Sequence, residues 1–302
     1  MVYKQWLEIW LNTYVMTSCK LRTYNNYRYA VIQYISPHLG EYELCELTIS
    51  VLQQFVTALL HPDRGKSLAA GTVNGIISVV QTSLKQAYIL GYTEHYEADK
   101  ICRPRNAEKR IECFNALEQR RIEVYIRNNS KFKLYGIIIC LYTGIRIGEL
   151  LALEWQCVDL NACRLMVEKT CFYLKNQRFE DVPKTACSRR SIPFPKQLLP
   201  IFKELYKKRQ TNYVIEENGK PIAVRSFQRS FELLLKKLNI PHRGFHSLRH
   251  TFATRALECG MDVKTLAELL GHSNPAMTLK RYAHSLIDYK IQMMNKLGKM
   301  LA

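Results

Sequence analysis

The sequence predicts a mainly α fold with a small antiparallel β-sheet, in which a helical N-terminal domain precedes a larger α+β domain. The chain has 302 residues, and this length suits two domains because one domain usually holds roughly 100–200 residues. In most segments apolar residues recur every three or four positions, which is the spacing of amphipathic helices. Short stretches between residues 165 and 195 are instead rich in β-branched and aromatic residues, which favour strands.

The first hundred residues are expected to form a helical domain, 1–100. The predicted helices span about 3–16, 22–36, 48–61 and 71–91. Thr48 and Thr72 are suitable N-caps because a hydroxyl side chain can bind the first free amides of a helix. Gly91 is a suitable C-cap because glycine adopts the left-handed conformation without strain.

A linker is predicted at residues 101–111, ICRPRNAEKRI, because this segment combines a proline with several basic side chains and has no apolar periodicity. An exposed basic linker can lie along a phosphate backbone. We therefore take four of its side chains as candidates for DNA binding: Arg103, Arg105, Lys109 and Arg110.

The second domain, 112–302, is predicted to begin and end with helices. The segments NALEQRRIEVYIRN, KLYGIIICLYTG and RIGELLALEW have helical patterns, and the third begins just after Gly144. Strands are expected in LMVEKTCFYL, RFEDVPKT and SRRSIPFP, which polar turns separate. Further helices are predicted at about 196–209, 225–238, 246–258, 262–270, 275–283 and 285–300.

The charge distribution points to nucleic acid as a partner. The net charge is +18, and residues 1–100 carry equal numbers of acidic and basic side chains, so the whole excess lies in the second part of the chain. A domain that neutralises phosphates gains affinity by releasing counterions. A solubilising surface is the alternative, and composition alone does not separate the two.

Composition also disfavours several other classes of protein. The 47% hydrophobic content is too high for a disordered chain. No apolar stretch approaches the ~20 residues that span a bilayer, and the N-terminus lacks a signal-peptide pattern. The ten cysteines form no C-x-x-C pair, so we expect free thiols in the cytoplasm and no structural metal site.

Arg146 and Glu149 form the first candidate pair for chemistry. Arg146 opens a predicted helix directly after a glycine turn, and Glu149 lies on the same helix face at the i, i+3 spacing. The arginine would therefore stand over a backbone turn. The ordinary alternative is a helix ion pair of little energetic value.

The segment HSLRHTFAT supplies a second pair, His246 and Arg249, at the i, i+3 spacing. His250 adds a histidine at i, i+4, which raises the possibility of a zinc helix. Metal binding is a poor interpretation, because Ser247 stands where a metalloprotease needs glutamate and Arg249 would repel a dication. The alternative for this pair is a core histidine beside a surface arginine.

Three more candidates follow the same logic. In LGHSNPAMTLKRYAH a helix ends at a glycine, His272 lies in the turn, and Asn274 can cap a new helix that carries Tyr282 near its end. Lys184 lies at the end of one predicted strand, before the turn into the next. Taken singly, such a tyrosine usually packs in a core and such a lysine usually faces solvent.

Together these residues match the needs of phosphoryl transfer. Two arginines offer fixed donor forks to the oxygens of a phosphate on which charge develops. A tyrosine is a weak nucleophile until cations and a base favour its phenolate. A lysine on a hairpin can deliver the proton that the leaving oxygen needs.

The motifs TGIRIGE, HSLRHTFAT and LGHSNPAMTLKRYAH, with the hairpin lysine, resemble the tyrosine recombinase (phage integrase) family over about 111–302. The resemblance implies a helical core-binding (SAM-like) domain followed by an α+β catalytic domain. It also implies that the protein cuts and rejoins DNA without ATP or metal, through a 3′-phosphotyrosyl intermediate and a Holliday junction, as a homotetramer on double-stranded core sites.

The resemblance assigns a role to each candidate. Tyr282 attacks the phosphodiester and Lys184 is the general acid. His246 is the base or orients the tyrosine, while His272 donates a hydrogen bond to the phosphate. Two arginines clamp the phosphate and Glu149 supports the site; these arginines are Arg146 and Arg249.

Some points stay open at the level of sequence. Lys169 and Lys175 lie in the same predicted strand region as the chosen lysine, which is favoured because SRRSIPFP follows it. Three further arginines are candidates for DNA binding and not for chemistry: Arg189, Arg190 and Arg243. Type IB topoisomerase-like relaxation of DNA and a catalytically silent DNA-binding regulator remain the alternative functions.

The C-terminal tail, 285–302, carries an apolar stripe at helical spacing. Its members are Leu286, Tyr289, Met293, Leu297 and Met300. Docking on a neighbouring protomer and packing on its own domain explain the stripe equally well. Because the chain begins almost at once with its first helix, we expect a recombinase that binds core sites only.

Overall fold

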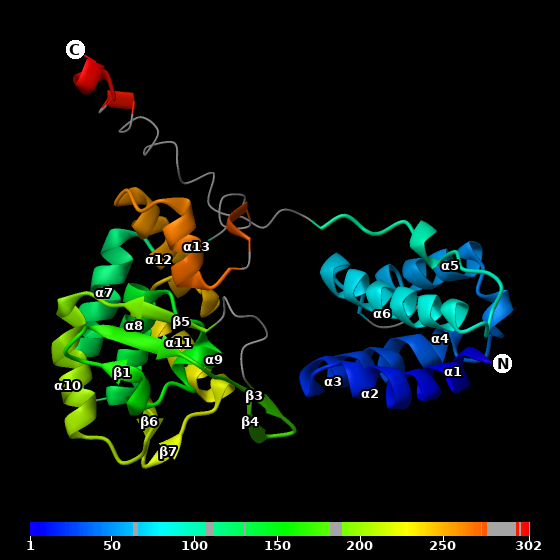
Figure 1. Cartoon of the computed structure of the whole chain (residues 1–302), viewed down its shortest axis with the longest axis horizontal. Helices are drawn as coiled ribbons and strands as arrows, with labels where there is room; N and C mark the ends of the chain where they lie inside the picture. The colour runs from blue at the N-terminus through cyan, green and yellow to red at the C-terminus, as the bar shows by residue number, and fades with distance from the viewer. Residues whose placement is uncertain are drawn as a thin grey trace. The chain divides into compact units, whose positions relative to one another are not determined.

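The computed structural model divides the chain into two compact units, residues 1–109 and 110–302. The structure describes residues 1–62, 66–106, 112–129, 131–181, 189–272, 274–276, 294–295 and 297–301. Both units are mainly helical and the strands lie in the second unit (Figure 1), in agreement with the predicted fold class.

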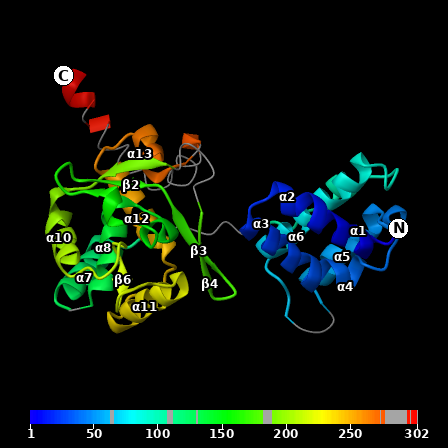
Figure 2. The same ribbon diagram turned by 60° about the horizontal axis from the view of Figure 1, so that its bottom comes forward.

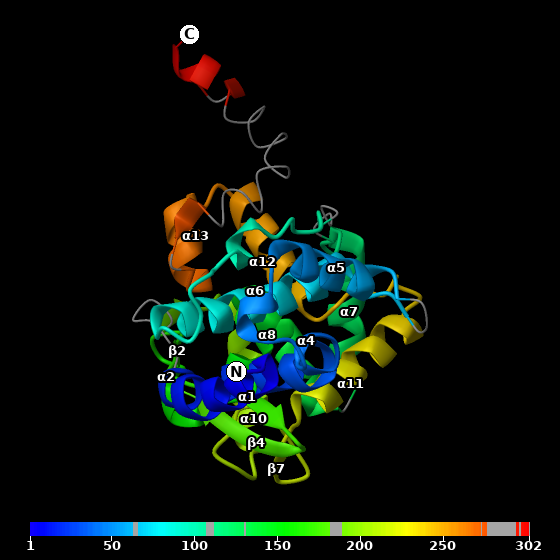
Figure 3. The same cartoon turned by 90° about the vertical axis from the view of Figure 1, so that its right-hand side faces the viewer.

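The first unit consists of helices α1 to α6. Their bounds are α1 (Tyr3–Ile9), α2 (Met16–Ser18), α3 (Leu21–Ala30), α4 (Ser36–Leu39), α5 (Ile49–Leu60) and α6 (Ala70–Ile89). A π-helical segment joins α1 to α2 and another joins α3 to α4, so the two long predicted helices are continuous. Helices α1 and α4 contact each other, as do α5 and α6 (Figure 3).

Buried polar contacts help to fix the first unit. Ser83 of α6 is fully buried; its hydroxyl lies 2.5 Å from the Tyr3 hydroxyl, and its carbonyl accepts a hydrogen bond from the Trp6 indole at 3.0 Å. The predicted cap at Thr72 is wrong, because α6 begins at Ala70 and its N-cap is Ala69. Gly91 lies just beyond α6 with φ +77°, as expected for a glycine that ends a helix.

The predicted linker does not begin as a free segment. Ile101 belongs to the core of the first unit. Arg103 donates hydrogen bonds to the Asn74 carbonyl at 3.1 Å and to Gln81 Oε1 at 2.6 Å, both on α6. Residues 101–106 therefore follow the surface of α6, whereas residues 107–111 lie outside the described residues.

The second unit contains helices α7 to α13. Their bounds are α7 (Ala116–Arg127), α8 (Tyr135–Thr143), α9 (Ile147–Leu150), α10 (Leu199–Lys207), α11 (Val224–Lys237), α12 (His246–Glu258) and α13 (Val263–Leu270). Asn115 caps α7 by accepting a hydrogen bond from the Glu118 amide, while the Glu118 carboxylate accepts one from the Asn115 amide. Among the described helices, none is both long and apolar enough to cross a membrane.

The strands form several small antiparallel sheets instead of the single sheet that the sequence predicts. Their bounds are β1 (Val158–Asp159), β2 (Arg164–Val167), β3 (Thr170–Leu174), β4 (Gln177–Asp181), β5 (Arg190–Pro193), β6 (Glu216–Glu217) and β7 (Lys220–Pro221). One sheet has the order β1-β2-β5, and β3-β4 and β6-β7 are separate pairs. The β3-β4 hairpin projects from the body of the unit (Figures 1 and 2).

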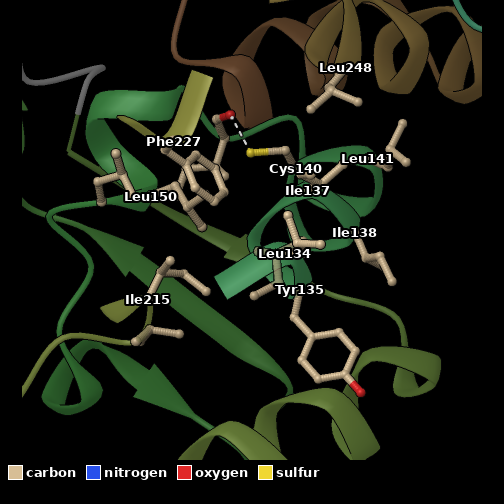
Figure 4. Packing of buried hydrophobic residues seen from close by; sticks show 14 of the residues in the cluster. Leu134, Tyr135, Ile137, Ile138, Cys140, Leu141, Leu150, Ile215, Phe227 and Leu248 are labelled. Carbon is tan, nitrogen blue, oxygen red and sulfur yellow. Dashed lines mark hydrogen bonds between the residues drawn. The ribbon is translucent and has the colours of Figure 1, made fainter. Parts of the chain in front are cut away.

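The buried helix α8 forms the centre of the second core. Ile137, Cys140 and Leu141 of α8 face Leu150, Phe227 and Leu248 from three other elements (Figure 4). The Cys140 thiol donates to the Ile145 carbonyl at 3.5 Å, which ties α8 to the turn that follows it. The nine cysteines in the described parts of the chain are all free thiols.

Two glycines of this unit have a left-handed backbone but differ in the space around them. Gly144 has φ +64°, and a Cβ there would lie 2.4 Å from Phe252 Cδ1 and 3.0 Å from Leu270 Cδ2. Gly260 has φ +89° and would meet nothing within 4 Å. The two positions therefore share the backbone conformation that disfavours a Cβ, but only the first lacks room for one.

We expect Gly260→Ala to lower the free energy of unfolding by about 1 kcal/mol through backbone strain alone. Gly144→Ala should cost about 1–3 kcal/mol more, because it adds overpacking. Urea denaturation followed by circular dichroism measures both values. Equal losses at the two positions would show that the contact with Phe252 relaxes without cost.

Candidate active site

Arg146 stands in a turn between two helices of the second unit. Helix α8 ends at Gly144, whose left-handed backbone redirects the chain. Arg146 is then extended, with φ −73° and ψ +149°, and immediately precedes α9. Its guanidinium donates to Glu149 Oε1 at 2.8 Å and to the Gly271 carbonyl at 3.1 Å, while 36% of its side chain stays exposed.

Glu149 is a buried carboxylate between two arginines. Its side chain is 5% exposed, and it accepts hydrogen bonds from the Arg146 amide at 3.0 Å and from the Arg146 guanidinium. Arg190 binds the same carboxylate through two nitrogens, at 3.1 Å and 2.8 Å. Burial alone would raise the pKa of Glu149, but the bonds and charges of the two arginines outweigh it and lower this pKa to about 2.

Arg190 lies inside the protein and not on its surface. Its relative exposure is 8%, and besides the two bonds to Glu149 its Nε donates to the Leu269 carbonyl at 2.6 Å. The burial and the internal partners of Arg190 therefore do not support the predicted contact with DNA. The alternation of side chains along a strand could have indicated this burial, because Arg190 lies on the same face of β5 as Ile192, which is a core residue.

Arg249 projects from α12 into a buried position, with 2% exposure. Its guanidinium donates to the Gly144 carbonyl at 2.8 Å and to the Leu270 carbonyl. Its Nη2 also lies 3.0 Å from Nε2 of His272. The structure thus brings Arg249 and His272, which belong to two different sequence motifs, into direct contact.

The C-terminal end of α13 holds all three arginines. Each of its last carbonyls accepts a hydrogen bond from a different side chain: Leu269 from Arg190, Leu270 from Arg249, and Gly271 from Arg146. Carbonyls at a helix end lack helical partners and carry the negative end of the helix dipole. This end of the helix is therefore a suitable acceptor for a group of cations.

His246 is the first residue of α12 and is exposed. Its ring lies 4.7 Å from the ring of His250, at 88°. One helical turn separates His246 from Arg249 on the same helix. In the described parts of the chain, no group of three or more His, Cys, Asp or Glu side chains is arranged to hold a metal ion.

The remaining candidates are distributed as follows. Tyr282 and Lys184 lie outside the described residues, as do Lys109 and Arg110. Before Tyr282 the predicted helix start is confirmed, because Pro275 is helical and Asn274 Oδ1 accepts the Ala276 amide at 2.8 Å.

The other arginines proposed for DNA binding differ in exposure. Arg105 and Arg189 are exposed. Arg243 instead pairs with Glu118 at 2.9 Å, and its guanidinium lies 4.9 Å from the centre of the Phe114 ring. The structure thus gives Arg243 internal partners that link the start of α12 to α7.

Lys169, the alternative to Lys184, is held by acidic partners. Its Nζ lies 2.6 Å from Glu154 Oε1 and 3.8 Å from Glu180 Oε2. The hydrogen bond to Glu154 is the main cause that raises the pKa of Lys169 above its usual value. Lys175, the other alternative, lies in the β3-β4 turn with φ +45°.

Comparison with known proteins connects this geometry to one family. A profile of the phage integrase family matches residues 114–288, and a profile of the N-terminal SAM-like domain of phage integrases matches residues 2–60. The chain is 28% identical to a tyrosine recombinase XerC-like protein of Caldanaerobacter subterraneus subsp. tengcongensis, over 94% of this chain and 79% of the relative.

Solved structures share the fold. The Tn1549 transposon integrase in complex with a circular intermediate DNA matches with a TM-score of 0.83 and 21% identity, over 98% of this chain and 99% of that one. A λ integrase tetramer bound to a Holliday junction matches with a TM-score of 0.69 and 17% identity, over 91% of this chain and 78% of that one. At these identities the likeness concerns the fold.

The lowered pKa of Glu149 predicts how stability depends on pH. A carboxylate whose folded pKa lies below its unfolded pKa stabilises the protein above the unfolded pKa, and this contribution is lost as pH falls through the folded value. The lowering from the usual 4.5 to about 2 corresponds to on the order of 3 kcal/mol.

We expect Glu149→Gln to be less stable than wild type at pH 7, and the difference to narrow between about pH 5 and pH 2. Urea denaturation across this range measures it. Glu268→Gln, a change of an exposed carboxylate on α13, is the control. A difference that stays constant with pH would contradict the assigned ion pairs.

Proposed function

Because the chain belongs to the phage integrase family, we infer that it is a site-specific recombinase that cuts and rejoins DNA through a covalent tyrosine intermediate. The observation that carries this proposal is the cationic group at the end of α13. Arg146 and Arg249 donate hydrogen bonds to the carbonyls of Gly271 and Leu270 there, and His272, the next residue, contacts Arg249. Such fixed donors suit a phosphate whose oxygens gain charge in the transition state.

Each residue is proposed to act at a defined atom. Tyr282 Oη attacks the phosphorus, so that a 3′-phosphotyrosyl bond forms while the bond to the 5′ oxygen breaks. Lys184 gives that oxygen its proton, and His246 accepts the tyrosine proton or orients the phenol. His272 donates to a phosphate oxygen. The energy of the broken bond is kept in the phosphotyrosyl bond, so the second transfer needs neither ATP nor a metal.

The two arginines have different accessibility, which suggests different tasks. The partly exposed guanidinium of Arg146 can reach a phosphate oxygen while two contacts keep it aligned. Arg249 is 2% exposed, so its charge acts from a region that excludes water, where electrostatic interactions are stronger. Both would stabilise the pentacoordinate phosphorus.

The acidic surroundings of Lys169 support Lys184 as the general acid. A general acid works best when its pKa lies near the working pH. Glu154 and Glu180 move the pKa of Lys169 away from that range. Lys169 would therefore be a poor proton donor to the leaving oxygen.

We also propose the assembly that this chemistry needs. Exchange of strands between two duplexes requires four protomers, one for each strand cut, and the λ integrase of similar fold forms a tetramer on a Holliday junction. The basic excess after residue 100 would neutralise DNA phosphates. Docking of the 285–302 tail on a neighbouring protomer and action in the cytoplasm stay predictions.

We expect Tyr282→Phe to abolish the covalent linkage to DNA and to leave non-covalent binding intact, because only the nucleophilic oxygen is lost. A suitable probe is a library of nicked duplexes with a randomised segment, from which DNA that survives denaturation with detergent is recovered and sequenced. Tyr206→Phe, on the exposed surface of α10, is the matched control. Equal linkage by Tyr282→Phe would refute the assignment. Relaxation of supercoiled plasmid without site preference would instead favour a topoisomerase-like activity.

Lys184→Ala should slow covalent linkage by about 100-fold or more, the usual size of a general acid's contribution. Lys169→Ala should keep nearly the wild-type rate. A duplex whose leaving 5′ oxygen is replaced by sulfur should restore the rate of Lys184→Ala, since a thiolate leaves without a proton. The reverse ranking of the two variants would identify Lys169 as the acid.

A further inference from the structure

We propose that Arg190 is a positioning residue of the recombinase site, which orients Glu149 and through it Arg146, and which fixes the turn that carries His272. The proposal rests on the proposed function, because it concerns the alignment of residues that would bind the reacting phosphate. It gives a task in the reaction to an arginine that the sequence had suggested as a contact to DNA.

The first support is the fork that joins Arg190 to Glu149. Two guanidinium nitrogens bind the two carboxylate oxygens, at 3.1 Å and 2.8 Å, and both side chains are more than nine-tenths buried. A bidentate pair fixes the plane of the carboxylate as well as its position. The same two oxygens accept the amide and the guanidinium of Arg146. The orientation of Arg146 therefore depends on Arg190 through one shared carboxylate.

The second support is the contact of Arg190 with the end of α13. Its Nε donates to the Leu269 carbonyl at 2.6 Å. A Cβ on Gly271 would lie 2.9 Å from its Nη1, so the guanidinium lies directly against the glycine turn. His272 follows this turn and lies 3.0 Å from Arg249. Arg190 thus links β5 to the turn that positions His272.

The third support is electrostatic. Glu149 is buried, and a buried carboxylate with a missing partner becomes easier to protonate. Glu154, Glu168 and Lys169 line a small cavity together with Glu149. If Arg190 were removed, Glu149 would keep its hydrogen bonds from Arg146 but lose those from Arg190, and its pKa would rise. A protonated Glu149 binds Arg146 less strongly, so the loss of Arg190 should also make the reaction sensitive to mildly acidic pH.

A direct contact between Arg190 and DNA makes different predictions. An arginine that binds a phosphate adds about one unit to the slope of the logarithm of DNA affinity against the logarithm of salt concentration. Arg190 has instead used its fork on Glu149 and its Nε on Leu269. Its removal should therefore change the rate of linkage and leave the affinity and its salt dependence unchanged.

The test compares Arg190→Met with Arg164→Met in the full-length protein, on the duplex recovered in the linkage experiment. Arg164 lies on the neighbouring strand β2 and is largely exposed, so the same substitution there controls for lost charge. Arg190→Met should lower the rate of covalent linkage by about 10–100-fold, the usual effect of removing a residue that supports a reacting group. Arg164→Met should keep the wild-type rate.

Two further measurements separate positioning from mere packing. The rate of Arg190→Met should fall at a higher pH than that of wild type as the solution is acidified. The double variant of Arg190→Met with Glu149→Gln should be no slower than the slower single variant, because both act through one carboxylate. If Arg190→Met does not fold, Arg190→Lys replaces it in the test, because lysine keeps the charge without the bidentate fork. Arg190→Lys should link DNA more slowly than wild type.

Three results would overturn the proposal. These are additive losses in the double variant, a pH profile unchanged from wild type, or a weaker affinity with a reduced salt dependence. Absence of covalent linkage in wild type and in Arg164→Met would contradict the proposed function instead. The link between Arg190 and Glu149 is then judged without DNA: the stability difference between wild type and Arg190→Met should narrow as pH falls, and a constant difference would refute it.

Discussion

The candidate site depends on how the protein compensates three positive charges that lie close together. Guanidinium groups repel one another, and two of these three, on Arg190 and Arg249, are buried. The free carbonyls at the end of α13 accept a hydrogen bond from each arginine, and they carry the negative end of a helix dipole. Glu149 adds a full negative charge between two of them. The positions of the cations are thus set by one helix end and one carboxylate.

Two left-handed glycines make this arrangement possible. Gly144 and Gly271 have φ values of +64° and +63°, and each ends a helix shortly before a residue of the site. Their carbonyls accept hydrogen bonds from Arg249 and Arg146 respectively. Because a side chain at either position would collide with its neighbours, the two turns are packed as tightly as a core. The active-site geometry is therefore part of the fold of the second unit and not of a loose surface loop.

The sequence predicted those features that depend on local pattern. Helical periodicity located the long helices to within a few residues, and motif spacing selected Arg146, Arg249 and His272, which the fold brings together. The predicted helix 146–155 was too long, because α9 ends at Leu150 and the carbonyls of Leu151 and Leu153 accept hydrogen bonds from residues outside the helix. Leu151, for example, accepts from Arg178 and not from a helical amide. Helix propensity cannot anticipate such tertiary partners.

Other features depended on contacts between distant segments and could not be predicted from pattern alone. The one predicted sheet became a three-stranded sheet and a separate hairpin, because β2 pairs with β1 and β5 while β3 pairs with β4. The β6-β7 hairpin was missed, although its Asn-Gly turn at residues 218–219, with φ +53° and +70°, is a strong local signal. Net charge was the least direct guide to individual residues. It indicated a phosphate-rich partner, yet some of the arginines that produce it bind carboxylates within the protein, as Arg190 does with Glu149 and Arg243 with Glu118. Only cations that displace counterions from DNA contribute to affinity, so composition identifies the class of partner while tertiary contacts decide which side chains meet it.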